Sequence, residues 1–90
     1  MEYEWDENKA VTNLSKHGVS FPEAKTVFDD PLYVDFYDPD HSYGECRFIL
    51  LGESAQGRLL FVSYRERNTI IRLISAREAT LSERKVYEQN

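Results

Sequence analysis

The spacing of apolar residues changes once along the chain, and this change constrains the fold more than any other feature. Before about residue 30, apolar side chains recur three and four residues apart, which is the spacing of one helix face. From Tyr33 onward they alternate with polar residues or form short apolar runs, as strands do. Helices followed by strands indicate the α+β class. A chain of 90 residues can bury only one core, so we expect a single domain over residues 1–90.

Two helices are expected near the amino end, and both have recognisable ends. Asp6 suits the N-cap and Gly18 suits the C-terminal end of a helix over residues 7–17. Ser20-Phe21-Pro22-Glu23 has the form of a capping box, which predicts a second helix. Asp29-Asp30-Pro31 is expected to end it.

Four strands and a closing helix are expected after these two helices. The predicted strands cover residues 33–37, 46–52, 58–67 and 69–77. Their short connections favour antiparallel neighbours. Thr80-Leu81-Ser82-Glu83 is another capping box and predicts a C-terminal helix to about residue 89. The sequence leaves open a short additional strand at residues 3–5.

Charge is distributed unevenly along the chain. The formal net charge is −5, which taken as a whole argues against nucleic-acid binding. Residues 1–46 hold eleven Asp and Glu against three Lys, a net −8, whereas residues 65–90 hold six Arg and Lys against four Glu, a net +2. Such asymmetry suggests a polyanion as partner of the basic end and a basic protein as partner of the acidic end.

Cysteine content and hydropathy indicate the compartment. Cys46 is the only cysteine, which excludes an internal disulfide and a cysteine pair for zinc. The amino terminus lacks the basic start and apolar stretch of a signal peptide. No apolar run approaches the ~20 residues needed to cross a bilayer. We therefore expect a cytoplasmic protein without a membrane segment.

The last third of the chain suggests a site that cleaves RNA. In the predicted strands over 58–67 and 69–77, apolar rows are followed by charged residues, and Arg84 begins a helix one short loop later. RNA carries its own nucleophile, the 2′-hydroxyl, so a protein needs only a base, a phosphate clamp and an acid. Glu66 is the candidate base, and the arginine fork matches phosphate oxygens. The candidate phosphate ligands are Arg67, Arg77 and Arg84. Further RNA contacts are expected from Arg65, Arg72, Lys85 and Tyr87.

Plainer interpretations stay open for these residues. Charges at strand ends are most often a solvated rim whose ion pairs contribute about 0–1 kcal/mol. Histidine side chains ordinarily titrate near neutrality, so His17 and His41 are secondary candidates for an acid or base, although His17 also suits the last turn of a helix. His41 among scattered carboxylates lacks the ligand spacing of a metal site. No metal or cofactor is therefore expected.

A series of short motifs runs in order along nearly the whole chain. They are Trp5-Asp6, Lys9, Asn13, 16–21, Glu23-Ala24, Val27-Phe28, His41-Ser42, Glu45, Arg47, Gly52, Ser54, Gly57-Arg58, Glu66-Arg67, 74–77, Ala79-Thr80, Glu83-Arg84 and Tyr87. In this order and spacing they resemble the BrnT toxins of type II toxin-antitoxin systems. The resemblance implies a RelE-like α+β fold, ribonuclease activity without a cofactor, and a BrnA-like antitoxin. It also implies functional roles for Glu66, Arg67, Arg77 and Arg84.

Two functions compete on this sequence. The leading hypothesis is a metal-independent endoribonuclease toxin that cleaves RNA by 2′-hydroxyl attack and is neutralised by a BrnA-like antitoxin, with DNA contacted only through that antitoxin. The alternative is a catalytically weak or inactive binding module that acts as the partner of a DNA-binding repressor. Glu66 and the three arginines favour the enzyme. Glu78, which follows the Ser-Ala-Arg motif, and the acidic net charge favour the alternative.

Overall fold

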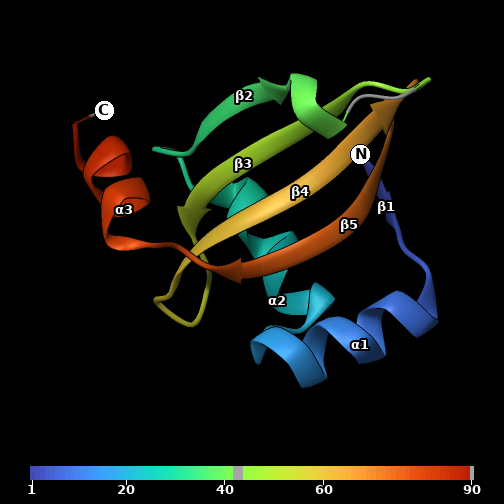
Figure 1. Cartoon of the computed structure of the whole chain (residues 1–90), viewed down its shortest axis with the longest axis horizontal. Helices are drawn as coiled ribbons and strands as arrows, with labels where there is room; N and C mark the ends of the chain where they lie inside the picture. Colours follow the sequence, from blue (N-terminus) through green and yellow to red (C-terminus); the bar gives the residue numbers. More distant parts are fainter. Residues whose placement is uncertain (42–43, 90) are drawn as a thin grey trace.

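The order of helices and strands follows the expected α+β plan. The computed structural model describes residues 1–41, without the side chain of His41, and residues 44–89. Among these residues, no helix has the length and apolar character needed to cross a membrane. The elements traced in Figure 1 are β1 (Glu2–Glu4), α1 (Glu7–His17), α2 (Phe21–Thr26), the 3-10 turn η1 (Val27–Asp29), β2 (Val34–Asp38), the 3-10 turn η2 (Pro39–His41), β3 (Arg47–Glu53), β4 (Leu59–Arg67), β5 (Ile70–Glu78) and α3 (Leu81–Glu88).

All the strands belong to one sheet, in the order β1-β5-β4-β3-β2. The four strands β2 to β5 are antiparallel to their neighbours, as their short connections predicted. β1 pairs in parallel with the first part of β5, from Glu2 opposite Ile70 to Glu4 opposite Arg72. The short strand that the sequence left open is therefore present, and it makes the sheet five-stranded and mixed.

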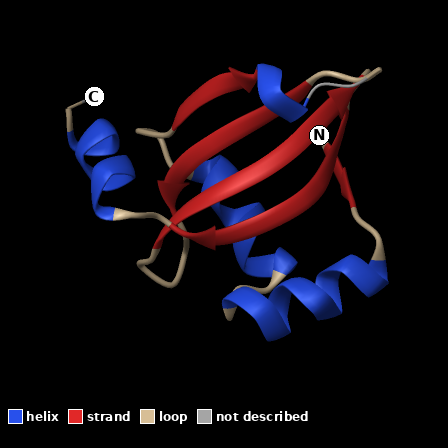
Figure 2. Ribbon diagram, in the orientation of Figure 1, coloured by secondary structure: helices blue, strands red, loops and turns tan. Residues whose placement is uncertain are grey.

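The two leading helices pack on the same side of the sheet, which we call the inner face. In Figure 2, α2 lies behind the sheet and α1 below it, whereas the front of the sheet carries no helix over its middle. The inner-face core includes Phe21 and Ala24 of α2 together with Leu50, Leu60 and Val62 of the sheet, all at most 1% exposed. Burying a Val, Leu or Phe side chain stabilises a fold by roughly 1.5–3 kcal/mol. This packing fixes α2 against the strands.

The start and end of α1 and the start of α2 lie where their capping residues predicted, whereas α2 ends at Thr26 and the 3-10 turn η1 completes the stretch up to Asp29. The Asp6 side chain accepts a backbone N–H from the first turn of α1 at 3.0 Å, and Gly18 closes the helix with a φ of 68°. Ser20 caps α2 by accepting the Glu23 N–H at 3.2 Å. The other half of the capping box predicted there is wrong, because the Glu23 carboxylate binds the side chain of Arg58 instead.

Asn13 fastens α1 to the edge of β5. β1 covers β5 only as far as Arg72, so the backbone beyond that point has no neighbouring strand on this side. The Asn13 amide accepts the Ala76 N–H at 3.0 Å and donates to the Ala76 carbonyl at 2.8 Å. It also donates to the Val19 carbonyl at 2.9 Å. A buried side chain thus supplies the backbone partners that a further strand would have provided.

A β-bulge in β5 reverses which residues face the core. Two consecutive residues of β4 pair with Leu73 and Ser75, which leaves Ile74 as an extra residue. Leu73 faces the core before the bulge and Ala76 faces it after the bulge, both 1% exposed. Arg77 therefore points away from α1 and α2. Read from the sequence with strict alternation, the strand over 69–77 would place Arg77 on the same side as Leu73, and the bulge makes that prediction wrong.

The C-terminal helix α3 is attached to the end of the sheet by polar contacts. Thr80 and Glu83 form the predicted capping box. Glu83 also binds Arg77, and the Tyr87 hydroxyl donates to the Asp30 carboxylate at 2.6 Å. A helix of eight residues is too short to be stable by itself. These contacts therefore determine where α3 lies.

Candidate active site

The side of the sheet opposite the inner face, the outer face, is hollowed by a groove. Two adjoining cavities of about 520 and 270 Å³ share Asp38, Ile49 and Phe61, and together they form what we call the outer groove. Its lining comes from β2, η2, β3, β4 and β5 and consists of Phe36, Tyr37, Asp38, Pro39, Asp40, Arg47, Ile49, Phe61, Ser63, Ile74, Ser75 and Arg77. A concavity of this size suits a small ligand or part of a nucleic-acid strand.

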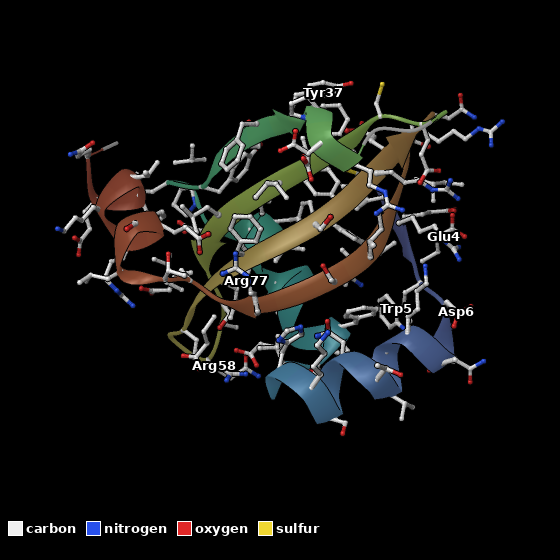
Figure 3. All side chains as sticks on the ribbon, in the orientation of Figure 1. Glu4, Trp5, Asp6, Tyr37, Arg58 and Arg77 are labelled. Atoms are coloured by element: carbon white, nitrogen blue, oxygen red, sulfur yellow. The ribbon has the colours of Figure 1, made fainter. Side chains whose placement is uncertain are left out.

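Arg77 is held in one orientation at the side of the outer groove. Its guanidinium carbon lies 4.0 Å from the centroid of the Phe61 ring. Its Nη1 and Nη2 atoms donate to the two carboxylate oxygens of Glu83 at 2.8 and 2.9 Å. Figure 3 shows the side chain over the front of the sheet, away from α1 and α2. The ring and the carboxylate together fix the guanidinium plane.

The Arg77–Glu83 pair keeps both side chains charged. The hydrogen bond with Glu83 raises the pKa of Arg77, and the same bond holds the pKa of Glu83 below its ordinary value. Glu83 occupies the Nη1–Nη2 end of the guanidinium, and Nη1 also donates to the Glu78 carbonyl at 3.2 Å. Within the described residues, the other edge, formed by Nε and the second Nη2 hydrogen, makes no hydrogen bond.

Carboxylates and aromatic side chains share the outer groove with Arg77. Asp38, at the end of β2, lines both of its cavities, and Asp40 of η2 lines the larger one. Phe36 is 43% exposed and also lines the larger cavity. Carboxylates can transfer protons, and exposed rings can stack on nucleic-acid bases. The groove therefore combines a fixed cation with groups suited to acid-base chemistry and base contact.

The predicted catalytic residues do not come together. β4 and β5 are antiparallel, so Glu66 and Arg67 lie beside the β4–β5 turn, whereas Arg77 lies opposite Phe61 towards the other end of the pair. Six residues of strand, or roughly 20 Å, separate Arg67 from Phe61. Glu66 also faces the inner side of the sheet, and Arg77 faces the outer side. The expected convergence of these side chains is therefore wrong.

Glu66 and Arg67 instead line a separate pocket of about 390 Å³ beside the β4–β5 turn. Its other lining residues are Gly44, Glu45, Cys46 and Arg65. Arg65 forms an ion pair with Glu45 there, and this hydrogen bond holds the pKa of Glu45 below its ordinary value. The residues singled out from the sequence are thus divided between two places on the sheet.

The other predicted RNA contacts lie outside the lining of the outer groove. Arg72 is ion-paired with Glu4 at 3.5 Å. Arg84 and Lys85 are exposed on α3. Tyr87 is half-buried, and its hydroxyl is engaged by Asp30 rather than presented for contact with a base.

The two histidines are placed differently from each other. His17 is the last residue of α1 and lines a pocket between α1 and β5 rather than the outer groove. The backbone of His41 belongs to η2, and its side chain lies outside the described residues.

Several groove residues were missed by sequence reasoning. Asp38 and Asp40 follow the predicted strand over residues 33–37 in a polar stretch that reads as a loop, and nothing local indicates that β2 and η2 bring them into one lining with Arg77. Phe61 and Ser63 did alternate onto one face of the predicted strand, and this was the available signal for the outer groove. Ser75 depends on the bulge at Ile74 and had no comparable signal.

Fold and groove define a small α+β protein whose helix-free sheet face presents an oriented arginine suited to a phosphate-bearing ligand. A family model described as the ribonuclease toxin BrnT of type II toxin-antitoxin systems matches residues 5–83. The chain therefore belongs to the BrnT family, which confirms the resemblance carried by its motifs. Toxins of type II systems act with a cognate antitoxin.

Comparison with solved structures supports the same architecture. The chain is similar to the ribonuclease toxin BrnT of Brucella abortus, with 24% sequence identity and a TM-score of 0.65 over 89% of this chain and 97% of that one. This likeness confirms the α+β fold. A comparison with curated proteins finds no match.

Proposed function

We propose that this chain is a metal-independent endoribonuclease that cleaves RNA in the outer groove, by attack of a 2′-hydroxyl on the adjacent phosphodiester. The observation that carries the proposal is the position of Arg77. Phe61 and Glu83 hold its guanidinium in a concavity that also contains Asp38 and Asp40. A preoriented cation is worth most in cleavage reactions that build up negative charge on oxygen.

Arg77 would bind the phosphate through its unoccupied edge. Nε and the second Nη2 hydrogen form a parallel pair of donors, which matches two phosphate oxygens. Glu83 stays on the opposite end of the guanidinium and keeps it from rotating. In this arrangement the extra charge on phosphorus in the transition state meets a donor pair that needs no reorganisation.

Asp38 is the proposed proton acceptor for the 2′-hydroxyl. As the 2′-oxygen bonds to phosphorus, the bond from phosphorus to the 5′-oxygen breaks, and that oxygen takes a proton from water, which leaves a 2′,3′-cyclic phosphate and a 5′-hydroxyl. Asp38 lines both cavities of the groove and so lies at their junction, where a bound phosphate would be close to Arg77 and Phe61. Phe36, exposed on the same wall, would stack on a neighbouring base. Such stacking is worth roughly 1–3 kcal/mol for each base.

Cleavage of RNA by purified protein in excess EDTA tests the proposal. Arg77→Ala should slow cleavage by about 10²–10³-fold, and Arg77→Lys should recover only part of the loss because an ammonium lacks the fork. Asp38→Asn should also be slow. Lys25→Ala is the charge-matched control, because Lys25 is exposed on α2, on the other side of the molecule. Replacing the 2′-hydroxyls of the RNA by hydrogen should stop cleavage.

Glu66→Gln separates the two candidate sites. If the outer groove is the active site, this variant keeps its activity, because Glu66 lies beside the β4–β5 turn and faces the inner side. A large loss with Glu66→Gln, together with normal activity in Asp38→Asn, would place cleavage at the pocket beside that turn.

The proposed partner is a BrnA-like antitoxin that covers the outer groove with a basic segment. β2 is an edge strand of the sheet, and at the groove it carries Tyr37, which is 50% exposed, and the half-buried acid Asp38. An edge strand can accept an added strand from a partner. Co-expression with the antitoxin should restore growth, and Tyr37→Asp in the toxin should weaken the complex. Contact with DNA would come only through the antitoxin.

One observation favours the second candidate, a binding module without cleavage. Glu83 and the Glu78 carbonyl already use one end of the Arg77 guanidinium, which partly neutralises it. RNA that stays intact with folded, antitoxin-free protein, combined with tight antitoxin binding, would establish this alternative.

A further inference from the structure

A further pocket, of about 300 Å³, lies between α1 and the free edge of β5. It exists because β1 stops opposite Arg72, so that α1 rather than a strand lies beside the later part of β5. Ile74 and Ser75 form the β5 wall at the bulge. Asn13, at the base of α1, holds the two elements together through Ala76.

The α1 wall of this pocket is cationic. Its charges come from Lys9 and Lys16, His17 also belongs to the lining, and no carboxylate takes part in it. Lys9 and Lys16 are exposed, and within residues 1–41 and 44–89 none of the three basic groups forms an ion pair. In a chain with a net charge of −5, basic groups gathered without acids are unusual.

Helix stability accounts for only part of this cluster. Lys16 and His17 are in the last turn of α1, where cations favour the helix dipole. Lys9 is in the first turn, where the dipole disfavours a cation. Helical spacing nevertheless brings Lys9 to the same side of α1 as Lys16, towards the pocket.

The pocket continues into the outer groove. Ile74 and Ser75 line both of them. Ser75 and Arg77 lie on the same side of β5 after the bulge, and their backbones are two residues, or roughly 7 Å, apart. A chain with its phosphate at Arg77 therefore reaches the α1 pocket without leaving the surface.

We propose that the pocket between α1 and β5 binds a backbone phosphate of the RNA next to the one held by Arg77, with Lys9 and Lys16 as its ligands. The inference rests on the proposed function, since the outer groove must bind RNA for this subsite to extend it. Lys9 and Lys16 act on substrate affinity and on the placement of the strand. Arg77 acts on the scissile phosphate.

Salt-dependent binding of a non-cleavable RNA tests the subsite. The probe is a fluorescent single-stranded oligonucleotide with 2′-O-methyl groups, which lacks the attacking hydroxyl, so that binding is measured apart from cleavage. The plot of log affinity against log salt changes slope by about 0.7 for each phosphate contact on a single strand. Because Lys9 and Lys16 share one phosphate, the double variant should flatten the slope by about 0.7 and bind on the order of tenfold more weakly, and each single variant should show part of that change. Lys25→Ala is the control and should keep the wild-type slope.

Cleavage of unmodified RNA by the same variants gives the second measurement. The double variant should show a raised KM and a kcat close to that of wild type, with an unchanged melting temperature because both lysines are exposed. If wild type binds and cleaves RNA but the slope of the double variant equals that of wild type or of Lys25→Ala, the subsite is overturned and the nuclease proposal stands. If wild type neither binds the probe nor cleaves RNA, both proposals are overturned.

Discussion

The carboxylate of Glu83 binds both terminal nitrogens of Arg77, at 2.8 and 2.9 Å, and also accepts the backbone N–H of Thr80 at 2.9 Å. One side chain thus caps α3 and orients the guanidinium of the outer groove. The position of the C-terminal helix and the geometry of the proposed phosphate site are therefore coupled.

Glu83→Gln separates two effects of Glu83, the orientation of the Arg77 guanidinium and the negative charge beside it. Glutamine can still serve the capping box, so α3 should remain helical. The variant loses a charge-assisted bond to Arg77, which exceeds a neutral one by about 1–1.5 kcal/mol. We expect kcat for RNA to fall by about tenfold, while the affinity for non-cleavable RNA rises because a negative charge has left the site. Unchanged values of both constants would show that Glu83 does not position Arg77.

Arg58→Ala should destabilise the fold and change its response to pH. The Glu23 carboxylate, 6% exposed, accepts from Arg58 Nε at 3.0 Å and from Ser54 Oγ at 2.8 Å. Removing the guanidinium leaves a buried charge without its main partner, which costs about 3–5 kcal/mol of the free energy of unfolding. Glu78→Gln is the control. It removes only an exposed partner of Arg58 at 3.7 Å and should cost at most about 1 kcal/mol.

The contribution of Glu23 to the free energy of unfolding should depend on pH with opposite signs in wild type and in Arg58→Ala. In wild type the Arg58 hydrogen bond lowers the pKa of Glu23 from 4.5, so the stabilisation is present above pH 4.5 and is lost as pH falls through the lower, folded-state value. Without Arg58, burial raises the pKa of Glu23 instead. Urea unfolding between pH 4 and 7 should then show Arg58→Ala gaining relative stability as the pH falls. A constant difference from wild type across this range would contradict the assignment.

Local sequence signals were sufficient for most helix ends and for the four antiparallel strands. Asp6 and Gly18 bound α1 as predicted, and Thr80 caps α3 as predicted, because a cap is a contact within one turn of its own helix. Strand pairing followed from short connections, which leave antiparallel neighbours as the accessible arrangement. These features depend on residues close together in the chain.

The convergence predicted for Glu66, Arg67 and Arg77 depended on pairings that are distant in the chain, and that prediction was wrong. A hairpin places the end of β4 beside the start of β5, so Arg67 and Arg77 had to lie at opposite ends of the pair, and this much was deducible. Alternation along β5 could not show which face of the sheet Arg77 occupies, because the bulge at Ile74 shifts the register by one residue. Ala76, a small apolar residue out of phase with Leu73, was the only trace of that shift.

Asn13→Ala should lower both stability and activity, because Asn13 holds the residue that precedes Arg77. The substitution removes both hydrogen bonds to the Ala76 backbone and the bond to the Val19 carbonyl, all of them buried. A buried backbone group left unpaired costs about 1–3 kcal/mol, so we expect a total of about 3 kcal/mol in denaturant unfolding. Val11→Ala, at a position of α1 that is 69% exposed, should change the free energy of unfolding by less than about 1 kcal/mol. Equal effects of the two substitutions would mean that Asn13 acts only through helix propensity.

Tyr87→Phe should remove the loss of stability that ionisation of Tyr87 causes at alkaline pH. The hydrogen bond to Asp30 and burial raise the pKa of Tyr87 from 10.0 to about 12. The protonated phenol is therefore the stabilising form, and its contribution is complete below pH 10 and lost as the pH rises through about 12. At neutral pH the variant should be less stable than wild type by about 1.5–3 kcal/mol, the value of a hydrogen bond to a charged group. Between pH 10 and 12 this difference in stability should shrink. The contributions of the other tyrosines cancel in the difference because both proteins contain them. A difference that stays constant up to pH 12 would show that the Tyr87 hydroxyl does not hold α3 on Asp30.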